Sequence, residues 1–198
     1  MTVKEYLRRN LNLPNVLSLI RLLLVPVYVA LFVRGLKYPA LAVFVAACLT
    51  DLLDGQIARK FNLITDLGKL LDPFADKVMV LTAMFSMAIG SQNIPPVIPW
   101  TAVIVLLLKE LVMMAGGLLL LKKGIVVYSR MIGKVAHCVF IVGLVLSYFH
   151  PRLARLCPDW PVTPDIIIVW LAVAITLCAM VYYITDSVRE AKKMGLLK

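Results

Sequence analysis

Apolar residues dominate the chain in long runs that are separated by short polar segments. Six runs approach the ~20 residues that an α-helix needs to span a bilayer, and they cover residues 17–33, 38–54, 68–90, 96–121, 131–149 and 165–185. The second and fifth runs are short or interrupted by polar residues, so their ends are the least sharply defined. The pattern predicts an all-α polytopic membrane protein, with six transmembrane helices in a single domain that covers residues 1–198.

Composition agrees with this interpretation. The chain is 62% hydrophobic and 16% charged, with a mean hydropathy of +0.92, whereas about a quarter of the residues in a soluble globular domain are charged. The cysteines form no CxxC pair and are interpreted as small hydrophobic residues rather than a zinc site or a disulfide framework. Gly116-Gly117, in the fourth run, is expected to be a point of close helix packing.

The residues that precede the first apolar run, 1–13, have a different pattern. Thr2 and Glu5 have the spacing of a capping box, and the basic residues Lys4, Arg8 and Arg9 stand among apolar ones. Such a segment suits a short amphipathic helix that lies on an anionic membrane surface. A disordered basic tail is the alternative.

The distribution of Lys and Arg predicts the orientation in the membrane. Most of the 21 basic residues lie in the two terminal tails, at 59–60 and in 122–134, and the positive-inside rule makes these segments and both termini cytoplasmic. The net charge of +10 is then explained by topology and lipid headgroups. Because the basic residues are spread over several loops without an aromatic-basic motif, we expect no nucleic-acid partner. Four cations lie within the predicted spans, where each is a functional candidate unless it snorkels to an interface: Arg21, Lys69, Lys77 and Lys109.

Carboxylates are concentrated between the second and third runs. The stretch TDLLDGQIARKFNLITDLGKLLDPFADK, residues 50–77, holds five of the chain's 11 acidic residues, Asp51, Asp54, Asp66, Asp72 and Asp76. An aspartate at mid-bilayer costs roughly 2.5–3.5 kcal/mol, so four of them near the membrane would cost about 10 kcal/mol unless water, cations or protonation offset it. A bare apolar environment is therefore excluded.

Helical spacing brings four of these carboxylates together. Asp51 and Asp54 are one turn apart near the end of the second run, and Gly68, Asp72 and Asp76 recur at i, i+4 and i+8 in the third. Two facing helices would present four carboxylates into one cleft that opens to the cytoplasm. Oxygen ligands without His or Cys suit Mg²⁺ or Mn²⁺, and a pair of such ions stabilises charge on a diphosphate during displacement at phosphorus.

The residues between the carboxylates fit a phosphate-containing substrate. Gly55 and Gly68 lack side chains where a substrate would approach the backbone, and Arg59 offers a guanidinium fork to a phosphate or a base edge.

The stretch resembles the signature of the CDP-alcohol phosphotransferase family. The matching residues are Asp51-x-x-Asp54-Gly55-x-x-Ala58-Arg59, eight further residues, and then Gly68-x-x-x-Asp72-x-x-x-Asp76. All the fixed positions and both spacings agree. The resemblance implies an N-terminal amphipathic helix, six membrane spans and a homodimer. Asp66 lies outside the signature and is interpreted as a solvated loop residue.

The resemblance also implies a role for each matching residue. Asp51 and Asp72 would bridge two Mg²⁺ or Mn²⁺ ions, Asp54 would complete the first metal site, and Asp76 would bind the second ion and act as the general base. The residues that it implies for binding CDP-diacylglycerol are Pro14, Asn15, Ser18, Asp54, Gly55, Arg59, Thr65 and Gly68.

The implied reaction is a single displacement at phosphorus. Asp76 takes the proton of an acceptor alcohol, whose oxygen attacks the β-phosphorus of CDP-diacylglycerol, and CMP leaves. Because a carboxylate is a weak base for an alcohol, metal polarisation and positioning must supply much of the acceleration.

The acceptor is less clearly indicated than the donor. NVLSLIRLLLVPVYVALF and GKLLDPFADK are similar to the bacterial phosphatidylglycerophosphate synthases, which implies sn-glycerol 3-phosphate as the acceptor and the cell (inner or plasma) membrane as the location. Its phosphate would need a cation, and the candidates are Lys109, Arg130 and Lys134. The alternatives are another enzyme of the family, using phosphatidylglycerol, serine or inositol phosphate, and, remotely, a cation channel or carrier. A transporter would not need Gly55, Arg59 and Gly68 at fixed spacing.

Overall fold

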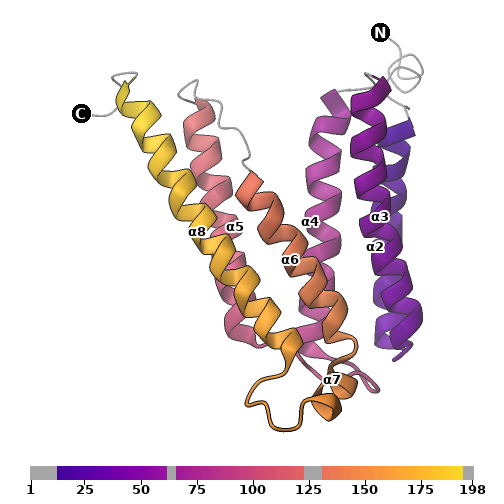
Figure 1. Ribbon diagram of the computed structural model, residues 1–198. Coiled ribbons are helices and arrows are strands. Elements are labelled where there is room, and N and C mark those ends of the chain that lie inside the picture. Colours follow the sequence, from indigo (N-terminus) through magenta and orange to yellow (C-terminus); the bar gives the residue numbers. More distant parts are fainter. Residues whose placement is uncertain (1–12, 62–65, 123–130, 194–198) are drawn as a thin grey trace. The chain divides into compact units, whose positions relative to one another are not determined.

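The computed structural model describes the backbone of residues 13–61, 66–122 and 131–193 (Figure 1). Within these ranges the chain forms seven α-helices and no β-strand. The helices are α2 (Leu13–Val33), α3 (Lys37–Phe61), α4 (Asp66–Ile89), α5 (Trp100–Lys122), α6 (Met131–Ser147), α7 (His150–Leu156) and α8 (Pro164–Lys193). The prediction of an all-α fold is confirmed for this part of the chain.

Each of the six predicted apolar runs coincides with a helix, namely α2 to α6 and α8. The short helix α7 was not predicted. It follows α6 after a break, with Pro151 in its first turn, and the two helices are bent by 82° from one another. The amphipathic helix predicted for 1–13 falls almost entirely outside the described residues.

Among the residues that the structure describes, three helices are long and apolar enough to cross a membrane, by length and composition. They cover Asn15–Val33, Trp100–Gly117 and Pro164–Arg189, and the bent pair of α6 and α7 makes a fourth if it is one span. In the described part of α4, Lys77–Ile89 forms a shorter apolar stretch. The count of six transmembrane helices therefore stays a prediction.

Large apolar side chains cover much of the outer surface of these helices. On α2, Leu23 and Val33 are both 62% exposed, and on α5 Leu108 and Leu111 are 57% and 56% exposed. Soluble monomers rarely carry apolar surface of this extent, whereas lipid tails solvate it at no cost. The exposed apolar surface and the long apolar helices together indicate a membrane protein.

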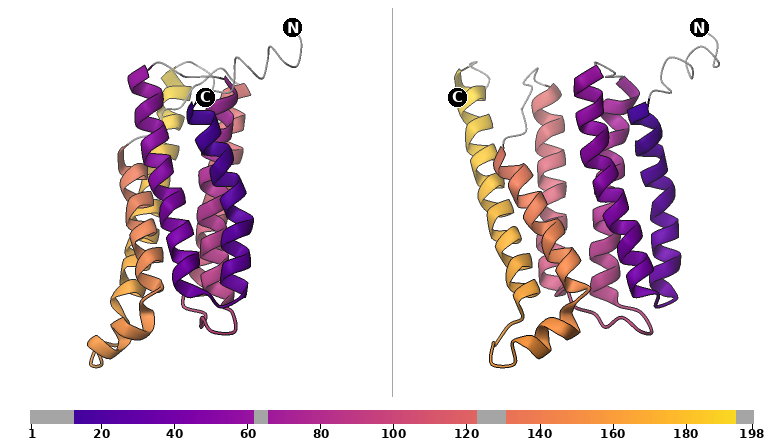
Figure 2. Two further views of the ribbon diagram at one scale, coloured as in Figure 1. Left: turned by 90° about the vertical axis from the view of Figure 1, so that its right-hand side faces the viewer. Right: turned by 45° about the vertical axis from the view of Figure 1, so that its right-hand side comes forward.

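The chain divides into two compact units, Met1–Pro96 and Val97–Lys198. In the first unit α2 packs extensively against both α3 and α4, and the three helices run alongside one another in both views of Figure 2. Small residues on their facing surfaces, including Ala40 and Ala47 on α3 and Ala75 and Ala83 on α4, are fully buried. Such residues let helix backbones approach closely where lipid supplies no hydrophobic drive.

Glycine ends two helices of the first unit. Gly35 has φ +71°, its N–H donates to the Phe32 carbonyl at 2.9 Å, and the Leu36 N–H donates to the Leu31 carbonyl at 3.0 Å. This pair of bonds is the Schellman motif, which a residue with positive φ permits. Gly90, which follows α4, has φ +78°. Both turns are at the opposite end of the unit from the end of α3 and the start of α4 (Figure 1).

In the second unit α6 lies along α8, and α5 also packs on α8. A β-carbon added at Gly143 of α6 would lie 3.0 Å from Cγ2 of Val169 and 3.3 Å from its backbone nitrogen, so this glycine lies where the two helices pack closely. Around Gly116 and Gly117, in contrast, no described atom lies within 4 Å of an added β-carbon. Among the described residues of the second unit, α5 therefore does not place these two glycines against a neighbouring helix, and their role as a packing point stays a prediction.

Candidate active site

The predicted site falls at one end of the first unit, where α2 begins, α3 ends and α4 begins (Figure 1). The buried face of α2 changes character toward this end. The C-terminal half of α2 buries the aromatic residues Tyr28 and Phe32. The N-terminal half buries three polar residues spaced three apart, Asn15, Ser18 and Arg21, which are 6%, 0% and 1% exposed. Residues at this spacing share one side of a helix, so α2 turns a polar stripe toward the helices packed on it.

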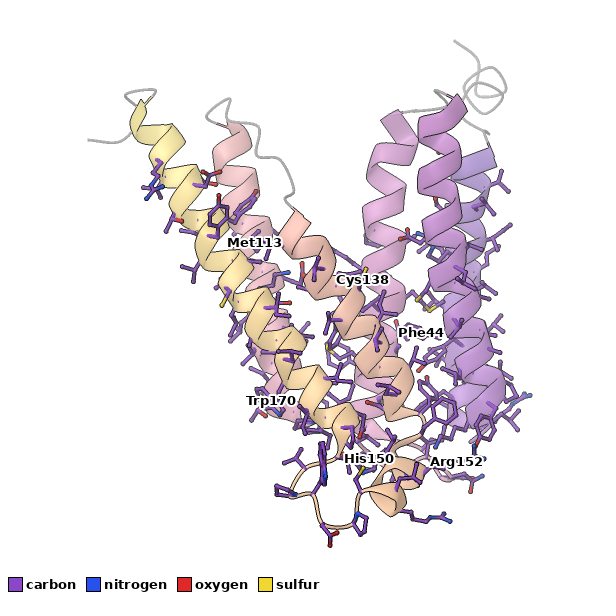
Figure 3. The ribbon with its side chains drawn as sticks, in the orientation of Figure 1. Phe44, Met113, Cys138, His150, Arg152 and Trp170 are labelled. Atoms are coloured by element: carbon purple, nitrogen blue, oxygen red, sulfur yellow. The ribbon has the colours of Figure 1, made fainter. Side chains whose placement is uncertain are left out.

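The buried face of α3 makes the same change. Phe44, labelled in Figure 3, is fully buried with Ala47, and its ring lies 6.3 Å from that of Tyr28 on α2. Asp51 follows Ala47 by four residues, and Asp54 follows by seven, so both positions continue the apolar stripe on the same side of the helix. The first two acidic positions of the signature therefore lie at the polar end of the core face of α3.

On α4 the order of polar and apolar positions is reversed, because α4 starts at this end. Positions 72 and 76 precede Met79 and Ala83 on one side of the helix by register, and these two residues are 1% and 0% exposed. The core faces of α2, α3 and α4 thus all pass from apolar to polar positions at the same end of the unit.

A direct ion pair joins two of these polar positions. The Arg21 Nη1 atom lies 2.8 Å from Oδ1 of Asp51, and the two side chains are 1% and 35% exposed. A guanidinium that is withdrawn from solvent to this degree needs a counter-charge, and the first signature aspartate supplies it. The sequence placed Arg21 only among the cations within the spans. Arg21 follows Ser18 by three residues and Asn15 by six, which puts the three on one side of a helix. This spacing is the sequence feature that could have included Arg21 in the site.

Most of the remaining predicted side chains lie outside the described part of the structure. Among the described side chains no three His, Cys, Asp or Glu residues gather as a metal site, and of the four proposed ligands only Asp51 belongs to that set. Thr65 and Arg130 lie outside the described backbone, and the side chains not described are those of Pro14, Asp54, Arg59, Asp66, Asp72, Asp76 and Lys134. The roles predicted for these residues stay predictions.

One backbone position differs from the prediction. Asp66 was interpreted as a loop residue, but it is the first residue of α4. An acidic residue suits this position because the first turn of a helix leaves N–H groups unpaired and carries a partial positive charge.

The acceptor candidates belong to the second unit or lie outside the described residues. Lys109 of α5 is partly buried, and its Nζ atom donates to Oε1 of its neighbour Glu110 at 2.6 Å. Lys134 is a residue of α6. The described structure therefore provides Lys109 with a partner of opposite charge, and it does not bring the three candidates together.

A polar cluster that the sequence did not predict connects the starts of α7 and α8. His150, labelled in Figure 3, has its Nδ1 atom 2.9 Å from Oδ2 of Asp165 and 3.2 Å from Oγ1 of Thr163. The Asp165 side chain is fully buried and belongs to the first turn of α8. The contacts join residues 13 and 15 positions apart in the sequence, and we interpret them as structural.

Comparison with known proteins identifies relatives along nearly the whole chain. The family model described as CDP-alcohol phosphatidyltransferase matches residues 11–180. The CDP-diacylglycerol--glycerol-3-phosphate 3-phosphatidyltransferase of Escherichia coli K12 is 30% identical over 177 residues, which is 88% of this chain and 93% of that protein. A probable phosphatidylglycerophosphate synthase of Mycobacterium tuberculosis H37Rv is 35% identical over 101 residues, or 48% of this chain and 46% of that protein. The match to this second relative thus spans about half of its length.

Proposed function

The chain belongs to the CDP-alcohol phosphatidyltransferase family, and on this premise we propose that it transfers a phosphatidyl group from CDP-diacylglycerol to sn-glycerol 3-phosphate. The products are phosphatidylglycerophosphate and CMP. The choice of donor rests on the family and on the signature between Asp51 and Asp76. The choice of acceptor is supported by the name of the Escherichia coli relative, whose match covers 93% of its length.

The observation that carries this proposal is the shared polar end of α2, α3 and α4. The buried polar stripe of α2 and the signature positions of α3 and α4 meet at the end of the unit where α3 and α4 are joined. An interior of this polarity is costly in a membrane protein and marks a functional site by default. The buried contact between Arg21 and Asp51 is the part of that site whose side chains are described.

The donor set fits hard divalent cations. Asp51, Asp54, Asp72 and Asp76 offer only carboxylate oxygens, which Mg²⁺ and Mn²⁺ prefer, and by helical register all four are on core faces at one end of the unit. When bound, two such ions would neutralise the negative charge that develops on the diphosphate during transfer.

The residues of the chain would bind the substrate and move one proton. Asn15 and Ser18, both buried on α2, would donate hydrogen bonds to the CDP moiety, together with Arg59 and Thr65. Asp76 would accept the proton of the acceptor hydroxyl as its oxygen forms a bond to the phosphorus of the phosphatidyl group. The bond between that phosphorus and the CMP oxygen then breaks, and CMP leaves as the anion.

The sn-glycerol 3-phosphate would enter with its own negative charge, for which the chain must offer a cation. Lys134 of α6 is our first candidate, and Arg130 and Lys109 are the other two. Lys109 already has Glu110 at 2.6 Å, which reduces its net charge and makes it the weakest of the three.

The proposal includes a membrane arrangement. The six long helices would each cross the bilayer, with both termini and the site facing the cytoplasm, where the basic segments lie. We also propose that the protein works as a homodimer in the cell membrane, as its family resemblance implies.

A substrate panel tests the function. The protein is purified in detergent and incubated with CDP-diacylglycerol, Mn²⁺ or Mg²⁺, and one alcohol at a time, and CMP and lipid products are measured by mass spectrometry. We expect CMP release that depends on sn-glycerol 3-phosphate and stops with EDTA. Release with phosphatidylglycerol, serine or inositol phosphate instead would reject the proposed acceptor, and no release with any alcohol would reject the activity.

A matched pair of variants tests the general base. Asp76→Asn should abolish turnover while CDP-diacylglycerol binding is largely kept, because an amide can no longer accept the proton. Asp66→Asn is the control, since Asp66 lies in the same helix but outside the signature, and it should leave turnover within about twofold of the unchanged protein. A near-normal rate for Asp76→Asn would refute the assignment.

A further inference from the structure

We propose that Arg21 is a resident counter-cation of the metal site: it offsets the charge of Asp51 while no metal is bound, and it lowers the affinity of the site for divalent ions. The inference rests on the proposed function, because it takes Asp51 to be a metal ligand. Arg21 lies outside the family signature, and the sequence alone assigned it no partner. Its position in the structure gives it a role in the site.

The burial of Arg21 excludes the ordinary explanation for a cation in a span. A snorkelling arginine extends its guanidinium to the interface and leaves it solvated, but the Arg21 side chain is 1% exposed. It lies on the buried face of α2, next to Ser18, which is fully buried one turn earlier. The guanidinium is thus directed into the packed helices, and its Nη1 atom reaches Oδ1 of Asp51 at 2.8 Å.

The contact is built into the packing of α2 on α3. One and two turns before Asp51, Ala47 and Phe44 are both fully buried, and the Phe44 ring centroid lies 6.3 Å from that of Tyr28 on α2. This rigid apolar segment fixes the register of the two helices and so determines which residue faces Arg21. The ion pair is therefore a stable part of the fold.

In the absence of metal a cation is needed at this end of the unit. The signature gathers Asp51 with three further acidic positions on neighbouring helical faces, and like charges brought together in a partly buried site repel one another. Arg21 offsets one of these charges at contact distance. The site can then form before any ion binds.

When metal is bound, the same cation opposes it. Arg21 and the metal would share the Asp51 carboxylate, and a positive charge so close to a divalent ion weakens its binding. A hydrogen bond to a metal ligand commonly acts in the other direction, raising metal affinity about 10- to 100-fold by orienting the ligand. Asp51 needs little such orientation because its position is already set by the helix packing, so we expect the repulsion between charges to dominate. Solvent reaches 35% of Asp51 and screens this repulsion, so the net effect should be about tenfold.

Metal binding to purified variants tests the inference directly. The wild-type protein and Arg21→Gln are loaded with Mn²⁺, and a chelator of known affinity is titrated in while free Mn²⁺ is followed by electron paramagnetic resonance. This competition starts from the metal-bound protein, so it does not require the variant to be stable without metal. We expect Arg21→Gln to bind Mn²⁺ about tenfold more tightly. Arg21→Lys, which retains the positive charge, should bind it within about threefold of the wild type.

A control separates the ion pair from general loss of packing. Phe32→Leu alters the same buried face of α2 without removing a charge, and it should lower stability but leave Mn²⁺ affinity unchanged. Equal or weaker Mn²⁺ binding by Arg21→Gln, with Mn²⁺ still bound by the wild type, overturns the counter-cation role and leaves the proposed function standing. A wild-type protein that binds no Mn²⁺ overturns both.

Discussion

Removing either partner of the Arg21–Asp51 pair should have unequal consequences for stability. The comparison uses Asp51→Asn, Arg21→Gln and the double variant, all measured in EDTA so that metal does not contribute. In the structure Arg21 is 1% exposed and Asp51 is 35% exposed, with 2.8 Å between Nη1 and Oδ1. Asp51→Asn therefore leaves behind a charge that solvent hardly reaches, whereas Arg21→Gln leaves behind one that solvent reaches in part.

The expected magnitudes follow from this difference in burial. Breaking a buried ion pair by removing one partner costs about 3–5 kcal/mol, because an uncompensated charge stays buried. Asp51→Asn leaves the buried guanidinium without this partner, so the loss in free energy of unfolding should be near the lower limit of that range, about 3 kcal/mol. Arg21→Gln leaves a carboxylate that solvent already reaches, and we expect only about 1–2 kcal/mol. The double variant has two neutral amides and should recover part of the loss, with a coupling of about 1–3 kcal/mol.

The assay is equilibrium unfolding of the detergent-purified protein in a titration with sodium dodecyl sulfate, followed by circular dichroism. The order of stabilities should be wild type, then Arg21→Gln and the double variant, then Asp51→Asn. If Asp51→Asn were no less stable than Arg21→Gln, the argument from burial would be wrong. If the double variant showed the sum of the two single losses, the contact would contribute nothing to stability.

Three further predictions concern other parts of the chain. Gly90→Ala should lower stability by about 2 kcal/mol or more, because φ is +78° and a β-carbon would lie 2.8 Å from backbone atoms. Gly116→Ala, at a position where no described atom is close, should be neutral or slightly stabilising. Equal melting temperatures for the two variants would contradict this prediction. Asp165→Asn should cost about 1–3 kcal/mol by weakening the contact with His150, and an unchanged melting temperature would show that the cluster is dispensable. Lys134→Gln should raise KM for sn-glycerol 3-phosphate about tenfold or more with KM for CDP-diacylglycerol unchanged, and the reverse pattern would remove Lys134 from the acceptor site.

The helices were largely predictable because their apolar runs are long and uninterrupted. Six runs correspond to six helices, with ends that differ by up to eight residues, because polar turns extend α3 and α8 beyond their apolar runs. The exception is α7, which lies in a short segment with several polar residues between two runs. Its first residue, His150, contacts Asp165, which is 15 residues away, and such pairing leaves no periodic signal in the sequence.

The glycines illustrate a second limit. Gly116-Gly117 has the composition of a packing point, yet no described atom lies within 4 Å of a β-carbon added at either residue. A β-carbon added at the single Gly143, in contrast, would lie 3.0 Å from Val169. A glycine allows close approach but does not require it. Which glycine is used depends on which side of the helix faces its neighbour.

By itself the sequence determined the helical architecture, the membrane character and the identity of the acidic signature, because these depend on hydrophobicity and on spacing along one helix. It also determined that Asp51 and Asp54 share a side of α3. Only the tertiary structure decided that α2 turns Asn15, Ser18 and Arg21 toward the same end of the unit, and that Arg21 is paired with Asp51. The physical reason is that helix packing sets the rotation and register between segments, and in this unit buried small and aromatic residues some distance from the pair determine both.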